Sequence, residues 1–129
     1  MDTLGLLLVV IVHSAAIQER DGGRRLLEWA QLFLPRLMIV WADQAYASLA
    51  TEWLHKTYRW MLNIVRREPG TKGFVVQPKR WIVERTLAWL GRYRRLSKDY
   101  EYLTRSSEAF VYLAMSHLML RRLSRYKRC

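Results

Sequence analysis

Apolar residues occur along the chain as short runs and as stripes with helical spacing. The first run, Leu4 to Val12, is almost continuously apolar, and residues 9–12 are all β-branched. Unbroken apolar runs rich in β-branched residues are typical of strands buried inside a sheet. We therefore predict a buried strand at residues 4–12.

The next part of the chain alternates helical and strand patterns. With Asp21 as its N-cap, apolar positions spaced three and four apart predict a helix that Pro35 closes. Residues 37–42 form an apolar run that ends at Asp43, and residues 60–65 form another. Residues 45–58 between them have the pattern of a helix. The order strand, helix, strand, helix, strand predicts an α/β fold with a short sheet.

The C-terminal part of the chain has a helical pattern. A turn-rich loop at residues 68–73 and an apolar stretch at 74–76 precede Pro78, which sets up the next element. Helices are predicted at residues 79–93 and 106–123. Because 129 residues are enough for one ordinary domain only, we treat 1–78 and 79–129 as two parts of a single domain.

The N-terminal apolar run does not predict a membrane span. A bilayer requires roughly 20 apolar residues, and Asp2 stands where a secretory signal carries basic residues. Processing after Ala16, or partition onto anionic membranes, would indicate a secreted or membrane-associated peptide instead. The single cysteine, Cys129, excludes an internal disulfide and a zinc-cysteine cluster. We expect a protein of a reducing compartment, the cytoplasm.

Basic residues outnumber acidic ones and concentrate in the C-terminal part. The chain has 22 Lys and Arg against 11 Asp and Glu, a formal charge of +11, and residues 79–129 hold 13 of the basic side chains with only four acidic ones. This balance predicts a polyanionic partner. Aromatic and apolar residues interleave with the candidate phosphate-binding side chains, which are Arg92, Arg94, Arg95 and Lys98. A solvated basic face is the alternative.

Two carboxylates lie in apolar surroundings. Asp43 follows a predicted strand and precedes a helix, the place where open α/β sheets bind ligands, although it also suits helix capping through the amides of Tyr46 or Ala47. Glu84 lies within a heavily apolar helix, one turn after Arg80. It predicts either a structural ion pair with Arg80 or a metal-ligating carboxylate.

Several segments together resemble the C-terminal part of a bacterial insertion-sequence transposase of the DDE type. The resemblance covers nearly the whole chain and is most specific from Arg80 onward. The matching segments are Asp2 to Leu8, Gln18 to Gly22, Trp41 to Tyr46, Gly73 to Val76 and Arg80 to Glu101.

The resemblance implies a ribonuclease-H-like catalytic domain that cleaves and joins DNA at insertion-sequence ends. Three carboxylates would hold two Mg²⁺ ions, or Mn²⁺, because this chemistry requires hard oxygen ligands. Asp43 matches the second Asp of the family, Glu84 its Glu, and Arg80 the accompanying Arg. The residues expected to contact DNA are Arg80, Arg85, Arg92, Arg94, Arg95 and Lys98.

Two departures from the family pattern affect the expected activity. The first catalytic Asp of the family precedes the segment that matches Asp2 to Leu8, and we interpret Asp2 as a turn residue. Ala45 replaces a Gly that is usual in the family, which predicts a shifted helix start. We expect a truncated fold that is inactive alone, with DNA, a homo-oligomer or a separate N-terminal part as partners in the nucleoid. The alternative is a non-catalytic basic DNA-binding remnant.

Overall fold

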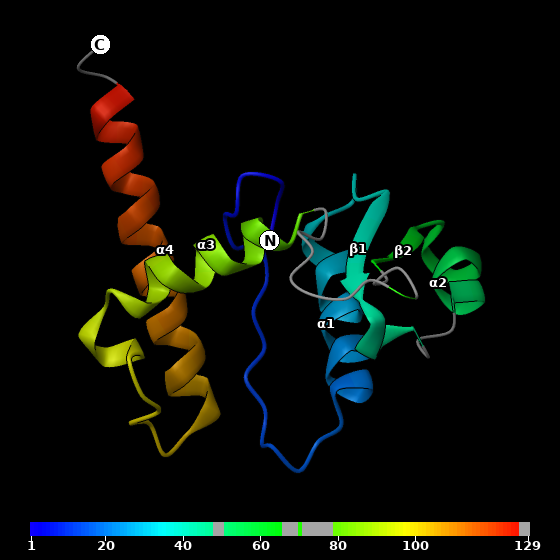
Figure 1. The fold of residues 1–129 in the computed structure, drawn as a ribbon, viewed down its shortest axis with the longest axis horizontal. Coiled ribbons are helices and arrows are strands. Elements are labelled where there is room, and N and C mark those ends of the chain that lie inside the picture. Colours follow the sequence, from blue (N-terminus) through cyan, green and yellow to red (C-terminus); the bar gives the residue numbers. More distant parts are fainter. Residues whose placement is uncertain (48–50, 66–69, 71–78, 127–129) are drawn as a thin grey trace. The chain divides into compact units, whose positions relative to one another are not determined.

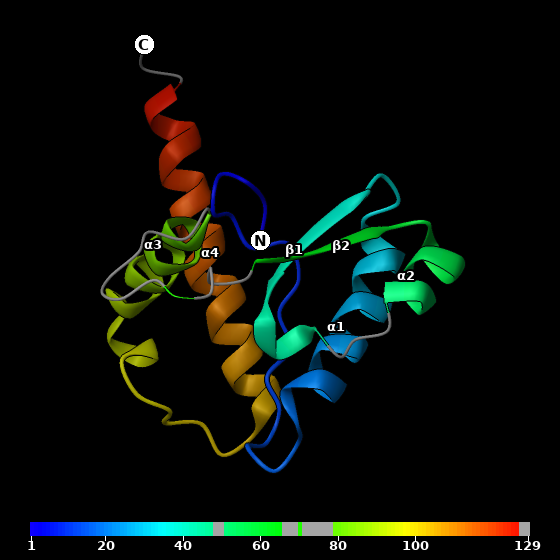
Figure 2. The ribbon, with the colours of Figure 1, turned by 45° about the vertical axis from the view of Figure 1, so that its right-hand side comes forward.

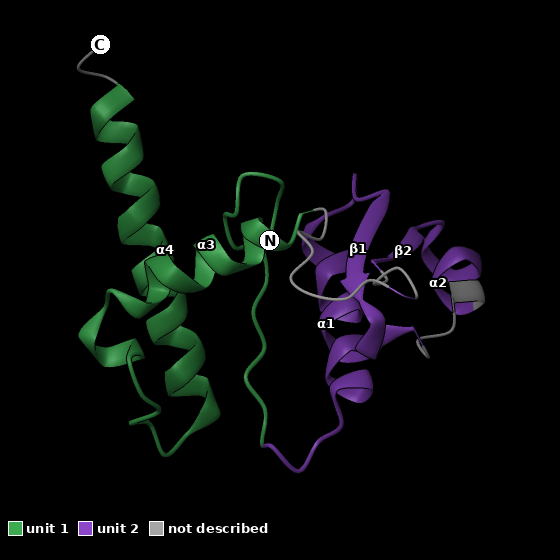
Figure 3. Ribbon diagram, viewed as in Figure 1, with its two compact units in different colours: residues 1–14, 79–129 green, residues 15–78 purple. Residues whose placement is uncertain are grey.

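The structure is a computed structural model that describes residues 1–47, 51–65, 70 and 79–126 (Figure 1). Its elements in chain order are α1 (Glu19–Phe33), β1 (Ile39–Asp43), the 3₁₀ helix η1 (Gln44–Tyr46), α2 (Thr51–Tyr58), β2 (Met61–Val65), α3 (Arg80–Gly91), the 3₁₀ helix η2 (Arg94–Leu96) and α4 (Thr104–Tyr126). They form two compact units, shown in Figure 3. Unit 1 comprises residues 1–14 and 79–129, and unit 2 comprises residues 15–78.

Unit 2 is built on a pair of parallel strands. Ile39 of β1 pairs with Met61 of β2, and the register continues to the pair Asp43 and Val65. Parallel strands need a crossover connection, which η1 and α2 provide here. Both α1 and α2 lie below the strands in Figure 2. The buried side chains in the described part of the unit come from both helices and from the residue before β2, and they are Leu27, Ala30, Leu54 and Trp60.

The elements predicted for unit 2 are present, with different starts for the two helices. α1 begins at Glu19 with Gln18 as its N-cap, so the predicted cap at Asp21 is wrong, and Asp21 lies in the first turn, where its charge favours the helix dipole. Both predicted strands are confirmed, and β1 ends on Asp43. The helix predicted from residue 45 begins instead as the short η1, and residues 48–50 lie outside the described part.

Unit 1 contains α3 and α4, both of which confirm predicted helices. α3 buries Ile82 and Thr86, and the longer α4 buries Ala114 and Met115. The two helices contact each other and η2 within the unit. The loop predicted at 68–73, except for residue 70, and the apolar stretch before Pro78 lie outside the described residues.

The strand predicted at residues 4–12 is wrong. This segment has no strand partner among the described residues, and side chains of α4 satisfy part of its backbone. The amide of Val10 donates to the Tyr112 hydroxyl over 2.9 Å, and that of Val12 donates to Glu108 over 2.8 Å. The segment is an irregular stretch of unit 1 in Figure 1. Most of its apolar side chains are half-buried, and Leu4 and Leu8 are exposed.

The described elements are mainly helical and include the one small parallel sheet, which confirms an α/β fold. None of the helices in the described ranges combines the length and the apolar character needed to cross a membrane. The position of β1 puts Asp43 at the end of a strand in unit 2, whereas α3 carries Glu84 in unit 1.

Candidate functional site

Asp43 occupies an exposed position at the C-terminal end of β1. Its Oδ1 accepts a hydrogen bond of 3.0 Å from the backbone amide of Ala45, so the side chain caps η1. The capping interpretation is confirmed, although the donor is Ala45 and neither Tyr46 nor Ala47. Burial raises the pKa of Tyr46 above its ordinary value, with smaller contributions from the charges of Glu19 and Asp43. The carboxylate therefore acts both as a cap and as a local negative charge.

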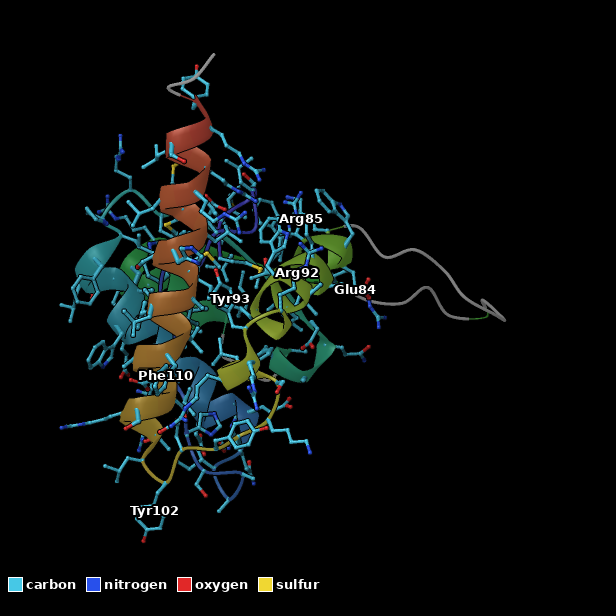
Figure 4. All side chains as sticks on the ribbon, turned by 90° about the vertical axis from the view of Figure 1, so that its left-hand side faces the viewer. Glu84, Arg85, Arg92, Tyr93, Tyr102 and Phe110 are labelled. Carbon is cyan, nitrogen blue, oxygen red and sulfur yellow. The ribbon has the colours of Figure 1, made fainter. Side chains whose placement is uncertain are left out.

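Glu84 forms the predicted ion pair on the surface of α3. The Nε of Arg80 donates to its Oε1 over 2.9 Å, and the two side chains are 58% and 59% exposed. Glu84 lies on the side of α3 that faces away from α4 in Figure 4. An exposed pair of this kind contributes about 0 to 1 kcal/mol, because water screens both charges. Glu84 is therefore accessible to a ligand, and the fold does not depend on it.

Arg85, the next residue, is held inside unit 1 by aromatic rings. Its guanidinium lies 4.4 Å from the ring centroid of Trp81 and 4.8 Å from that of Trp89, one helical turn away on either side. Its Nη2 donates to the carbonyl of Leu4 over 2.6 Å. Both rings stack on this cation, and Trp81 is 51% exposed.

The N-terminal turn docks on α3 directly after Glu84. Asp2 Oδ1 accepts from the amides of Leu4 and Leu6 at 2.9 and 2.8 Å, which confirms Asp2 as a turn residue. The fully buried Thr86 hydroxyl lies 2.7 Å from the carbonyl of Gly5. Gly5 has a φ of 78°, a left-handed conformation that glycine adopts readily. Contacts from Arg85 and Thr86 thus fix the turn to the helix that carries Glu84.

The remaining candidates for DNA contact differ in how they are engaged. Arg95 donates to Glu101 over 2.7 Å, and its guanidinium lies 5.1 Å from the ring centroid of Phe110. Arg94 and Lys98 are exposed, without an ion pair to any residue that the structure describes. Arg92 lies beside a groove between α3 and α4.

This α3–α4 groove has a volume of about 380 Å³. Its lining consists of Trp89, Arg92, Tyr93, His117, Leu118, Arg121, Arg122 and Arg125. The Tyr93 hydroxyl and His117 Nδ1 are 2.9 Å apart, and the two rings meet nearly edge to face at 77°. Arg122 covers Trp89 with its guanidinium 4.3 Å from the ring centroid.

The α4 residues of this groove are not among the residues expected to contact DNA. The sequence nevertheless contains a usable signal, because His117, Arg121 and Arg125 are spaced four apart and so share one face of the helix. The partners on α3 were not predictable in the same way, since the packing of the two helices is a tertiary property. Figure 4 shows Tyr93 between α3 and α4.

The carboxylates do not gather into a metal centre within either unit. In the described ranges, no three side chains of the kinds that bind metals lie together. Unit 2 contributes Asp43 and unit 1 contributes Glu84. A pair of divalent cations needs several oxygen ligands, so the described residues of neither unit fit such a pair by themselves.

Comparison with known protein families gives a match. The model of the transposase DDE domain matches residues 1–119, which include both Asp43 and Glu84. No curated protein and no solved structure matches the chain. The match spans elements of both units and covers more than half of the sequence. The chain therefore belongs to the family of transposase DDE domains.

Proposed function

We propose that the chain is the C-terminal part of a bacterial insertion-sequence transposase with a ribonuclease-H-like fold, acting on DNA at the nucleoid. The observation that carries this proposal is the family match over residues 1–119. The reaction would be cleavage and strand transfer at insertion-sequence ends. Unit 1 supports a DNA partner, because it holds 13 basic and only five acidic side chains.

Asp43 and Glu84 are the proposed catalytic carboxylates. DDE transposase domains generally use divalent metals, and Mg²⁺ or Mn²⁺ would supply Lewis-acid chemistry to the reacting phosphate. Both side chains are exposed and offer hard oxygen atoms. Two carboxylates are fewer than the three that the chemistry requires. We therefore expect the chain to be inactive alone and to need a further carboxylate from a homo-oligomer or a separate N-terminal part.

A non-catalytic DNA-binding role is the second candidate. Both candidate carboxylates already have protein partners, since Asp43 accepts from Ala45 and Glu84 from Arg80. The excess of basic side chains in unit 1 does not depend on either of them. DNA binding by phosphate contacts alone would use that charge without any reaction.

A nicking assay with matched variants tests the two roles. The full chain, Glu84→Gln and Asp43→Asn are each incubated with Mg²⁺ or Mn²⁺ and a supercoiled plasmid that carries the DNA flanking the chain's own reading frame. Glu28→Gln is the control, because Glu28 forms an exposed ion pair with Arg24 at the same spacing as Glu84 with Arg80. We expect DNA binding by all four proteins and nicking by none.

Two results would change these conclusions. Nicking by the chain and by Glu28→Gln, lost in Glu84→Gln, would show a complete active site and refute the expected inactivity. DNA binding by the same four proteins is measured at increasing salt concentration. The slope of the log binding constant against the log salt concentration counts phosphate contacts, because each contact contributes about −0.9 on duplex DNA. An absence of DNA binding at low salt would refute both roles.

A further inference from the structure

The α3–α4 groove concentrates positive charge that its own lining does not offset. Four guanidinium groups line it, those of Arg92, Arg121, Arg122 and Arg125, and no carboxylate is among the described lining residues. Like charges in one groove repel each other and lower the stability of the unliganded protein. A bound polyanion would relieve that repulsion, so the groove favours a ligand with closely spaced negative charges.

Aromatic side chains among these arginines indicate a ligand with flat rings as well as charge. Trp89 lies against Arg122, whose guanidinium is 4.3 Å from the ring centroid. A planar guanidinium stacked on an aromatic ring still has a second face, and nucleic-acid bases stack on such faces. Tyr93 is held in the groove by His117 through the 2.9 Å contact between its hydroxyl and Nδ1. The lining thus combines phosphate-binding cations with a stacking surface.

The size of the groove favours a single strand over a duplex. Its volume of about 380 Å³ lies at the lower end of the range for pockets that hold small ligands, roughly 300 to 1,000 Å³. One nucleotide is of a size that suits this volume. The bases of a duplex are instead stacked and paired inside the double helix, where they cannot stack on residues of the groove. Positively charged grooves with aromatic platforms are the general means of binding single-stranded nucleic acid.

We propose that the α3–α4 groove binds an unpaired DNA strand, with phosphates on Arg92, Arg121 and Arg125 and a base stacked on Arg122 above Trp89. This inference rests on the proposed DNA function and deepens it. It assigns the groove to a strand that is separated from its complement, and it adds three residues of α4 to the DNA-contacting surface: Arg121, Arg122 and Arg125.

The charge contribution is tested with two double variants of the full chain. Arg121→Ala/Arg125→Ala removes two charges from the groove, and Arg36→Ala/Arg105→Ala removes two from exposed positions outside it. The probe is a fluorescein-labelled oligothymidylate of about 12 nucleotides, within the known range of single-strand sites. We expect the groove variant to bind at least tenfold more weakly. The slope of its log binding constant against log salt concentration should be smaller in magnitude by about 1.4, because each of the two lost single-strand phosphate contacts contributes about 0.7. The control should lose threefold or less.

The base contact is tested with variants that keep the charge. Arg122→Lys removes the planar group, whereas Arg105→Lys makes the same change at an exposed position outside the groove. Stacking on a side chain changes affinity by about fivefold or more per base, so we expect at least a fivefold loss for Arg122→Lys and less than twofold for Arg105→Lys. The same measurement on an abasic strand of equal length should show no difference between the two variants.

The outcomes separate this inference from the proposed function. If the chain binds neither single strands nor duplexes at low salt, the DNA function itself fails. If it binds DNA and the groove variant matches the Arg36→Ala/Arg105→Ala control, only the groove assignment is overturned. Tighter binding of the duplex form of the same oligonucleotide would overturn the assignment of the groove to an unpaired strand. Competition by inorganic polyphosphate as strong as that by the unlabelled single strand would do the same, because polyphosphate has no bases.

Discussion

The contacts inside unit 1 differ in kind from the contacts inside unit 2. Unit 2 encloses Leu54 and Trp60 almost completely, next to the strand pair. Unit 1 buries Ile82, Ala114 and Met115, and polar groups add further long-range contacts. Thr86 holds Gly5 and Arg85 holds Leu4, each over a separation of 81 residues. The contrast shows that a basic, helical unit can use its arginines for structure.

This difference changes how the charge of unit 1 is interpreted. Three of the six basic residues expected to contact DNA are engaged within the protein, because Arg80 pairs with Glu84, Arg85 stacks between two tryptophans, and Arg95 pairs with Glu101. Net charge therefore overstates the positive charge available for phosphates. The arginines of the α3–α4 groove share only Arg92 with these six, and the other three lie on α4.

The largest expected effect is on the core of unit 2. Leu54→Ala should destabilise the protein by about 2 to 5 kcal/mol, because Leu54 is fully buried and its removal leaves a cavity. Leu32→Ala, at a position 74% exposed on α1, is the control and should change stability by about 0.5 kcal/mol or less. Urea unfolding gives the magnitude. Hydrogen exchange locates the effect, which we expect in unit 2. A loss of protection in α4 as large as that in unit 2 would contradict the expected difference between the units.

The next effect concerns the turn docked on α3. Gly5→Ala should destabilise unit 1 by about 1 to 3 kcal/mol, because an added Cβ would lie 2.8 Å from Thr86 Oγ1 in a left-handed backbone conformation. Gly91→Ala meets open space at the end of α3 and should instead stabilise by up to about 1 kcal/mol. Thermal unfolding compares the two. A neutral Gly5→Ala would mean that the turn does not contribute to the stability of unit 1.

A smaller effect tests the structural use of arginine. Arg85→Lys keeps the charge but removes the planar group that lies over Trp81 and Trp89, so we expect a loss of about 1 kcal/mol. Arg94→Lys is the control, because Arg94 is exposed and has no ring contact in the described part of the chain. The urea unfolding midpoints of the two variants compare their stabilities. Equal midpoints would show that the stack adds nothing to unit 1.

The smallest effect is electrostatic and lies in unit 2. Burial raises the pKa of Tyr46, and the charges of Glu19 and Asp43 add to the shift, so Asp43→Asn should lower that pKa slightly. A raised pKa in the folded state favours folding below the ordinary pKa of the phenol, about 10, and this contribution disappears as pH rises through the folded value. Carbon-13 NMR of labelled tyrosine measures the titration. An unchanged pKa would show that the charge of Asp43 does not reach Tyr46.

Local patterns predicted the elements of this fold better than its contacts. The spacing of apolar residues was sufficient for α1, α3 and α4, and the run before Asp43 was sufficient for β1, because these signals lie within one element. The run at residues 4–12 misled, since two of its amides, those of Val10 and Val12, bond to Tyr112 and Glu108, which are about a hundred residues away in the sequence. No local pattern contains that information.

The candidate site was predictable to a similar degree. The Arg80 and Glu84 pair and the cap at Asp43 follow from spacing alone and are present. The engagement of Arg85 with Trp81 and Trp89 also has helical spacing, yet that pattern equally suits a buried apolar face. The α3–α4 groove required knowledge of how two helices pack, which periodicity does not give.

The hydrogen bonds from residues 10 and 12 to α4 have a consequence for synthesis on the ribosome. Unit 2 is one continuous segment, so all of its residues have been synthesised before α4 is translated. Unit 1 joins residues 1–14 to residues 79–129, and the amide of Val10 meets Tyr112 only after 102 further residues. During that interval the apolar N-terminal segment is nascent chain without its partner, open to chaperones and to aggregation. The last helix to be made is therefore the one that completes the fold begun by the first residues.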